Sequence, residues 1–436
     1  MPRVTPAMLA RPTMPDPAAH PPDSPAPDAY AAFRHAGYRA YALGWVLVLV
    51  GTQIQSVALQ WELYERTQDP LALGLVGLVQ IVPALLLLLP GGHAADTFDR
   101  RRLIALGMVG TTLTSLGLAV AAWGIAPVWV FYVLLFCDAS CLALARPARA
   151  ALLPLIVPEA IFGNAVTWNS SLFQLAMMVG PAAGGLVVAL YIPAAFLISA
   201  AGSLAFLIML QRIALRPQDR RREPVSVDSL LGGFRFVRRS PMVLGAISLD
   251  MFAVLLGGAT YLLPIYAKDI LHVGEWGYGL LRAAPAVGAM GTAVVLAHLP
   301  PMQRAGRTML LAVAGFGAAT IVFGLSPWFW LSLAMLVLCG VCDNISVVIR
   351  HTLVQLATPD HTRGRVSAVN SVFIGLSNEL GGFESGLVAK LVGPVFSVVS
   401  GGVGTLVVVG STALLSPSLR RLRRLSDITP AQGATS

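Results

Sequence analysis

Five acidic side chains lie inside long apolar stretches of this 436-residue sequence: Asp138, Asp250, Asp343, Glu379 and Glu384. An ionised carboxylate is costly to bury, so an acid in such a place is a candidate functional group. A carboxyl in a partly dry cavity is able to bind and release a proton at neutral pH, or to pair with a cation. We expect proton exchange at Asp250 first and at Asp138 next.

Some of these acids also have a structural interpretation. Asp343 precedes Arg350 by two helical turns on the same face, so an ion pair between them is an alternative to a cavity position. Glu379 and Glu384 are five positions apart and point in different directions, and Glu384 can reach the edge of its apolar stretch. Arg282 is expected to extend outward toward water. If it does not, it pairs with Glu379 or binds an anionic ligand.

Residue patterns that would indicate catalysis or metal binding are missing. The seven histidines are scattered, and the sequence has no HExxH, nucleophile-elbow or Walker pattern. All four cysteines lie in apolar stretches and suit packing. We therefore expect no catalytic residue, metal or cofactor, and a protein that is not an enzyme. Six further polar side chains can hydrogen-bond either a ligand or a neighbouring helix: Gln53, Gln55, Gln60, Asn169, Ser170 and Gln174.

The elements that carry these residues follow from the composition. Hydrophobic residues make up 56% of the chain and charged residues only 12%, which is too apolar for a protein surrounded by water. The apolar residues form blocks of about 20, the length that a bilayer-spanning helix needs. We predict an all-α integral membrane protein with twelve transmembrane helices, near residues 40–61, 71–93, 103–123, 127–149, 164–190, 193–213, 242–266, 277–299, 308–325, 328–350, 366–389 and 394–416.

The basic residues predict the orientation of these spans. All but four of the thirty Lys and Arg residues lie on one side of the predicted membrane; the exceptions are Arg66, Lys268, Arg282 and Lys390. Because basic loops stay in the cytoplasm, both termini are expected there, in the plasma (inner) membrane. The net charge of +9 is then explained by the basic residues of the cytoplasmic loops, so it does not indicate a nucleic-acid partner.

An internal repeat divides the chain into two halves. At a constant spacing of 201 residues, Pro158 matches Pro359, Asn169 matches Asn370 and Gly185 matches Gly386. This is the pattern of two six-helix halves in parallel orientation. The expected organisation is a disordered Pro-rich cytoplasmic tail (1–37), a six-helix bundle (38–213), a basic linker with an amphipathic helix along the inner leaflet (214–241), a second six-helix bundle (242–416) and a basic cytoplasmic tail (417–436).

Two short motifs stand out within the first half. The stretch "PGGHAADTFDRRRL" (90–103) concentrates charge between two apolar blocks, and Asp96 there can cap a helix or pair with Arg100 or Arg101. Gly92 permits close helix approach. The stretch "GPAAGG" (180–185) places Gly180, Pro181, Gly184 and Gly185 on a small, bent helix face. The structural alternatives are topology alone for the arginines and tight packing for the glycines.

These motifs resemble those of the major facilitator superfamily, and the resemblance covers residues 31–416. The first stretch is similar to the family signature between its second and third helices, with Thr97 and Asp99 departing from it, and "GPAAGG" is similar to its exporter signature. "GGATYLLPIYAKDIL" and "RHTLVQLATPDHTRGRVSAVN" resemble the subgroup of enterobactin and macrolide exporters. The resemblance implies that Gly92, Asp96, Arg100 and Arg101 form a cytoplasmic latch, and that Asp138, Asp250 and Asp343 face or adjoin a central cavity.

The resulting functional expectation is a secondary active transporter. It would export a small amphipathic molecule, such as a drug, siderophore or secondary metabolite, by proton antiport with alternating access. Import of a small metabolite, or a receptor or scaffold without transport, are the alternatives. The expected partners are a small-molecule substrate, protons and the lipid bilayer, and the chain is expected to be a monomer.

Overall fold

The computed structural model describes residues 28–124, 126–214, 227–300 and 302–428, and these residues form helices without a strand. Ten of the described helices are long and apolar enough to cross a membrane, and a bent helix pair makes an eleventh. Helix α16 (Asp360–Val392), with 33 residues, is also long enough but carries more polar residues. The predicted all-α, twelve-helix fold in two halves is confirmed.

The first half contains six spans. Its second span is broken at Leu87 and bent by 46°, because Pro90, the third residue of α4, has no backbone N–H to donate to the Leu86 carbonyl. The elements are α1 (Ala31–Arg34), α2 (Ala36–Thr67), α3 (Pro70–Leu86), α4 (Leu88–Thr97), α5 (Arg100–Trp123), α6 (Val128–Ala150), α7 (Leu153–Ile156), η1 (Glu159–Ile161), α8 (Phe162–Leu190) and α9 (Ile192–Gln211).

The second half repeats this order after the short linker helix α10 (Val227–Arg239). Its first span is interrupted at Gly257 and Gly258, where a Cβ atom would lie 2.7 Å from the Phe316 ring and 2.5 Å from the Gly381 carbonyl oxygen. The elements are α11 (Pro241–Leu256), η2 (Ala259–Leu262), α12 (Leu263–Ile265), η3 (Tyr266–Ile270), α13 (Gly274–His298), α14 (Ala305–Leu325), α15 (Phe329–Ala357), α16, α17 (Pro394–Leu415), α18 (Pro417–Arg421) and η4 (Leu425–Asp427).

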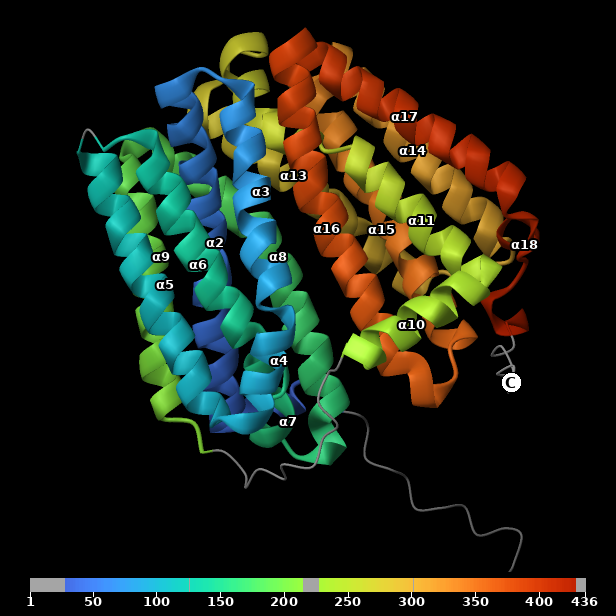
Figure 1. Cartoon of the computed structure of the whole chain (residues 1–436), viewed down its shortest axis with the longest axis horizontal. Coiled ribbons are helices and arrows are strands. Elements are labelled where there is room, and N and C mark those ends of the chain that lie inside the picture. The colour runs from blue at the N-terminus through green and yellow to red at the C-terminus, as the bar shows by residue number, and fades with distance from the viewer. Residues whose placement is uncertain (1–27, 125, 215–226, 301, 429–436) are drawn as a thin grey trace, which may run out of the picture.

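The two halves meet through two helix pairs, α8 with α13 and α3 with α16 (Figure 1). Both crossings use glycines. A Cβ atom on Gly185 would lie 2.7 Å from Cα of Gly279, and one on Gly386 would lie 2.7 Å from Cα of Gly74. Gly185 and Gly386 match in the 201-residue repeat, so equivalent glycines make the two crossings. The other glycines of the first-half motif, Gly180 and Gly184, pack instead against α2.

We call the end of the molecule formed by residues 62–70, 259–278 and 384–394 the closed end. Here side chains of the two halves bind each other: Lys268 pairs with Glu65 at 2.8 Å, and the Tyr64 hydroxyl donates to Asp269. Lys390 pairs with Asp69 at 2.6 Å. Partial burial raises the pKa of Asp69, but hydrogen bonds from Lys390 and the Leu71 amide outweigh it and lower that pKa below its ordinary value.

The opposite end, formed by residues 97–100, 150–164 and 357–365, is the open end. Figure 1 shows α3 and α16 close together at one end and diverging toward the other. A Cβ atom added to Gly163 on α8, or to Gly364 or Gly375 on α16, would meet no atom within 4 Å. The facing segments of α8 and α16 are therefore not packed against each other at this end.

Residues 28–37, the last part of the tail expected to be disordered, are ordered in the structure. The amide of Ala32 donates to Asn164 Oδ1 at 3.0 Å, and Asn164 and Trp168 donate to the Ala29 carbonyl at 2.9 and 2.8 Å. Order therefore begins by residue 28, because α8 supplies polar partners for this backbone; residues 1–27 lie outside the described part. Helix α10 packs on α16, with Val237 buried.

Candidate functional site

A cavity of about 410 Å³ lies mainly within the second half. Helices α11, α13, α14 and α15 form most of its wall, while α16 adds Asn378 and α8 of the first half adds Gln174. The apolar part of the wall includes Phe316, Phe323 and Leu336. A pocket with an apolar wall and a few polar groups is the usual form of a small-molecule site.

Asp343 supplies the charge of this cavity wall. It lies midway along α15, roughly 21 Å from either end of the helix at 1.5 Å per residue. Its carboxylate makes no hydrogen bond or ion pair with another described residue, and the described wall contains no Lys, Arg or His. Its neighbour Asn344 is 9% exposed and its Nδ2 has no hydrogen-bond partner. The unpaired acid on the wall thus lies next to an amide whose nitrogen is buried without a partner.

Asp250 is held by an ion pair with Arg350. Both residues are almost completely buried, at 5% and 2% exposure. The alternative partner for Arg350 considered from the sequence, Asp343, is seven residues away on the same helix, a rise of about 10.5 Å. Because α11 packs against α15, Asp250 reaches Arg350 instead. Asp250 is not among the residues that line the cavity.

Asp138 lies in a polar network inside the first half. Thr114 Oγ1 donates to its carboxylate at 2.9 Å and Gln55 Nε2 at 3.4 Å. Ser115 in turn donates to Gln55 Oε1 at 2.7 Å. The residue is 4% exposed and does not line the described cavity, so this network serves to join α2, α5 and α6.

Arg282 points inward, which corrects the expectation that it extends toward water. Its guanidinium donates to Gln60 Oε1 at 3.1 Å and to Ser56 Oγ at 3.3 Å, both on α2 of the other half. It also donates to the Thr260 carbonyl at 3.4 Å, and Tyr278 donates to the same Gln60 oxygen at 3.0 Å. Arg282 therefore joins the two halves next to Thr260 of the cavity wall. It points inward because neutral oxygens there accept its hydrogen bonds.

The two glutamates of α16 occupy different environments. The Tyr261 hydroxyl donates to Glu379 Oε2 at 2.5 Å, and a Cβ atom on Gly77 would lie 2.4 Å from the Glu379 carbonyl oxygen. Glu379 thus lies where α16 crosses α3. Glu384 receives a 3.5 Å hydrogen bond from Ser385 near the closed end. Neither residue lines the described cavity.

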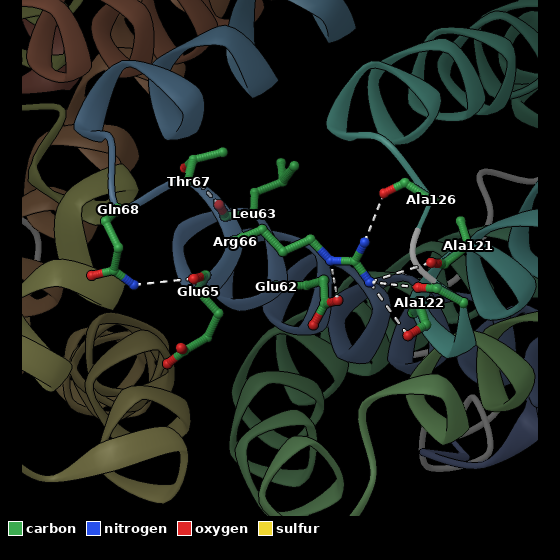
Figure 2. Close-up of polar contacts among 10 residues, drawn as sticks. Glu62, Leu63, Glu65, Arg66, Thr67, Gln68, Ala121, Ala122 and Ala126 are labelled. Atoms are coloured by element: carbon green, nitrogen blue, oxygen red, sulfur yellow. Dashed lines mark hydrogen bonds and ion pairs between the residues drawn. The ribbon is translucent and has the colours of Figure 1, made fainter.

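Arg66 organises the closed end of the first half (Figure 2). Its guanidinium binds the Glu62 carboxylate at 2.6 Å and donates to the carbonyl oxygens of Ala121, Ala122, Gly124 and Ala126 at 2.8 to 3.4 Å. Ala121 and Ala122 lie in the last turn of α5 and Gly124 caps it, at the end where a helix leaves its acceptors unpaired. Arg66 satisfies them and so fixes the turn between α5 and α6.

The charged turn between α4 and α5 is capped by Asp99. Its side chain accepts the Arg102 amide at 2.9 Å, whereas Asp96 lies in the last turn of α4. The expected helix-capping role therefore falls to Asp99, because α5 begins one residue after it. Gly92 is buried within α4.

The two arginines of the expected latch bind backbone carbonyls of the first half. Arg100 donates to the Ala151 carbonyl at 3.3 Å, and Arg101 donates to the Ile213 carbonyl. These bonds tie the start of α5 to the ends of α6 and α9. In this conformation both side chains thus organise the open end of the first half.

Twelve spans in two matching halves, with a cavity mainly in the second half and contacts that close one end, are the architecture of a membrane transporter. The chain belongs to the Major Facilitator Superfamily, whose family model matches residues 41–382. It is a multi-pass membrane protein of a family whose members are transporters.

The chain is also similar to individual proteins. The chain is 27% identical over 403 residues to an enterobactin exporter, EntS, of Escherichia coli, covering 92% of this chain and 96% of that one. The same identity over 401 residues relates it to the Shigella boydii exporter, with 91% and 95% coverage. In fold it is similar to a bacterial homologue of the lysosomal transporter Spinster in an inward-facing state (TM-score 0.67, 14% identity, 88% and 95% coverage). A bacterial ferroportin homologue, also inward-facing, has a TM-score of 0.65 at 16% identity, with 86% and 98% coverage.

Asn344 and Asn378 were not anticipated from the sequence as cavity residues. The repeat held a signal for Asn344: at a spacing of 201, Asp343 and Asn344 match Leu142 and Ala143 of the first half. Because the matching positions of the first half are apolar, the helix packing that the two halves share does not require a polar pair here. Such an asymmetry therefore points to a function that one half performs alone.

Proposed function

We propose that this chain exports a small amphipathic molecule from the cytoplasm across the inner membrane in exchange for protons. The observation that carries the proposal is the cavity midway through the membrane with the unpaired carboxylate of Asp343 on its wall. The similarity to enterobactin exporters over 92% of the chain supports export as the direction.

The distribution of basic residues supports a cytoplasmic position for the open end. Arg100, Arg101, Arg363 and Arg365 lie there, whereas the closed end has Arg66, Lys268 and Lys390. On that orientation the conformation is inward-facing, as are the Spinster and ferroportin homologues with the same fold. Transport then requires the closed-end contacts to break while the open end closes around the cargo.

Asp343 is the carboxylate that we assign to proton coupling. A coupling group must exchange protons with water and must respond to the cargo, and Asp343 lines the cavity that both would enter. Asp250, the first candidate from the sequence, is already neutralised by Arg350. Asp138 accepts hydrogen bonds within the first half. We assign these two residues to the stability of the helix bundles.

The test is transport by the full-length protein in liposomes under an imposed pH gradient. Erythromycin and enterobactin serve as trial cargoes, and a trapped pH-sensitive dye reports proton movement. We expect cargo flux that follows the gradient, and loss of proton movement in Asp343→Asn. The variant Glu159→Gln, which removes an equal charge at the surface, should behave as the wild type. Gradient-insensitive flux, or full coupling in Asp343→Asn, would contradict the proposal.

A further inference from the structure

We propose that the cavity selects organic cations, with Asp343 as the residue that binds their charge and Asn344 as a hydrogen-bond donor to a polar atom beside it. The inference rests on the proposed transport function, since it names the class of cargo for the same cavity. It does not depend on proton coupling or on the direction of transport.

The first support is the balance of charge around the cavity. Asp343 contributes a negative charge, and the described wall has no basic side chain to offset it. The arginines on two of the wall helices, α15 and α13, bind other residues. Arg350 binds Asp250, and Arg282 donates to Gln60, Ser56 and the Thr260 carbonyl. A carboxylate in a partly dry cavity gains most from a cationic partner, and no side chain of the described wall provides one.

The second support is Asn344, which follows Asp343 on α15 and also lines the cavity. It is nine-tenths buried, yet its Nδ2 has no hydrogen-bond partner among the described residues. A buried amide donor without a partner costs free energy, and natural proteins leave few of them. Because Nδ2 itself is buried, it can donate to a ligand acceptor, such as a carbonyl, ether or hydroxyl oxygen, once the Asn344 side chain turns toward the cavity.

The third support is the shape and apolar content of the rest of the wall. The ring of Phe316 lines the cavity, and Phe323 and Leu336, at 0% and 3% exposure, form the packed apolar layer behind it. Aromatic faces attract organic cations and also cover their apolar bodies. A volume of about 410 Å³ falls within the range of small-molecule pockets, so a drug-sized cation fits.

The repeat shows that helix packing alone does not require this polar pair. The equivalent positions in the first half are Leu142 and Ala143 on α6. There α6 packs against α4: a Cβ atom on Gly91 would lie 3.3 Å from the Ala143 carbonyl oxygen. The same place in the fold is thus built with apolar residues in the first half, which adds only Gln174 to the described cavity wall.

Equilibrium binding to the purified full-length protein in detergent tests the proposal, with two ions of matched size and opposite charge. The probes are tetraphenylphosphonium and tetraphenylborate. We expect the cation to bind at least about tenfold more tightly than the anion, because a partly desolvated carboxylate discriminates strongly by charge. Asp343→Asn should weaken cation binding by a similar factor, while Asp343→Glu keeps most of it. Glu159→Gln controls for the change in net charge.

The outcomes separate this inference from the proposed function. Equal binding of the two ions, no binding of the cation, or unchanged cation affinity in Asp343→Asn would overturn cation selection. A folded Asp343→Glu variant that restores affinity rules out a merely structural loss in Asp343→Asn. If the cation binds through Asp343 but liposome flux ignores the pH gradient, proton antiport fails and cation selection stands.

Discussion

The buried pair of Asp250 and Arg350 shows how a single contact determines the role of an intramembrane acid. Among the described residues each charge is paired with the other alone, so removing one leaves the second buried and unpaired. We predict that Asp250→Asn destabilises the protein by about 3–5 kcal/mol. The measurement is thermal unfolding of the detergent-purified variant.

The companion variant for this prediction removes both charges. Asp250→Leu combined with Arg350→Met should recover most of the lost stability, since a well-packed apolar pair often replaces a buried ion pair without loss. An Asp250→Asn protein as stable as the wild type would show that the pair does not hold α11 to α15. Asp250 would then return as a candidate for proton exchange.

At the scale of elements, the crossing of α8 with α13 determines how closely the halves approach at the closed end. A methyl group on Gly185 would lie 2.7 Å from both the Gly279 Cα and the Glu275 carbonyl oxygen. We predict that Gly185→Ala forces the helices apart and costs the closed end about 1–3 kcal/mol. Amide hydrogen exchange should then rise several-fold in residues 259–278.

The matched control lies on the same helix. Gly163→Ala adds the same methyl group to α8 where nothing lies within 4 Å, so exchange in residues 259–278 should stay at the wild-type rate. Equal exchange in the two variants would mean that the crossing does not limit opening. Gly386, the repeat partner of Gly185, offers an independent repetition at the α3–α16 crossing.

At the scale of the whole molecule, two ion pairs at the closed end bias the protein toward the described conformation. Both pairs are a third to nearly half exposed, so each contributes roughly 0–1 kcal/mol. Asp69 has a lowered pKa, so its contribution is present above the ordinary aspartate range and is lost only as the pH falls through that lowered value.

This sign predicts how the closed end responds to acid. Hydrogen exchange in residues 64–72, corrected for intrinsic rates, should not change between about pH 7 and pH 5, and should rise below about pH 4. In Asp69→Asn the increase in exchange of residues 64–72 below about pH 4 should be smaller than in the wild type, because the carboxyl that titrates there is gone. A steep increase already near pH 6 would show that another group controls opening.

Much of the architecture could be predicted because it depends on local properties of the chain. Spans of about 20 apolar residues and the 201-residue repeat can both be found without knowing which helices touch. The small face at Gly180 to Gly185 was found in the same way. The sequence did not show that Gly180 and Gly184 contact α2 while Gly185 contacts α13, because that depends on which helices lie on either side of α8.

The roles of the charged residues could not be predicted in the same way. Helical spacing placed Asp343 and Arg350 on one face, but the partner of Arg350 came from a different helix. Arg282 was expected to extend outward and instead bridges to α2, since three neutral oxygens converge on it there. Each pairing joins residues far apart in the chain, and the spacing within a helix carries no information about it.

The sequence by itself therefore determined that the protein is a twelve-helix, two-repeat membrane protein of the Major Facilitator Superfamily, and which few acids lie within its spans. Only the tertiary structure distinguished among those acids. It left Asp343 unpaired on a cavity wall and gave Asp250 a cation. The physical reason is that hydropathy acts along one segment at a time, whereas the partner of a buried charge is chosen by the packing of several helices.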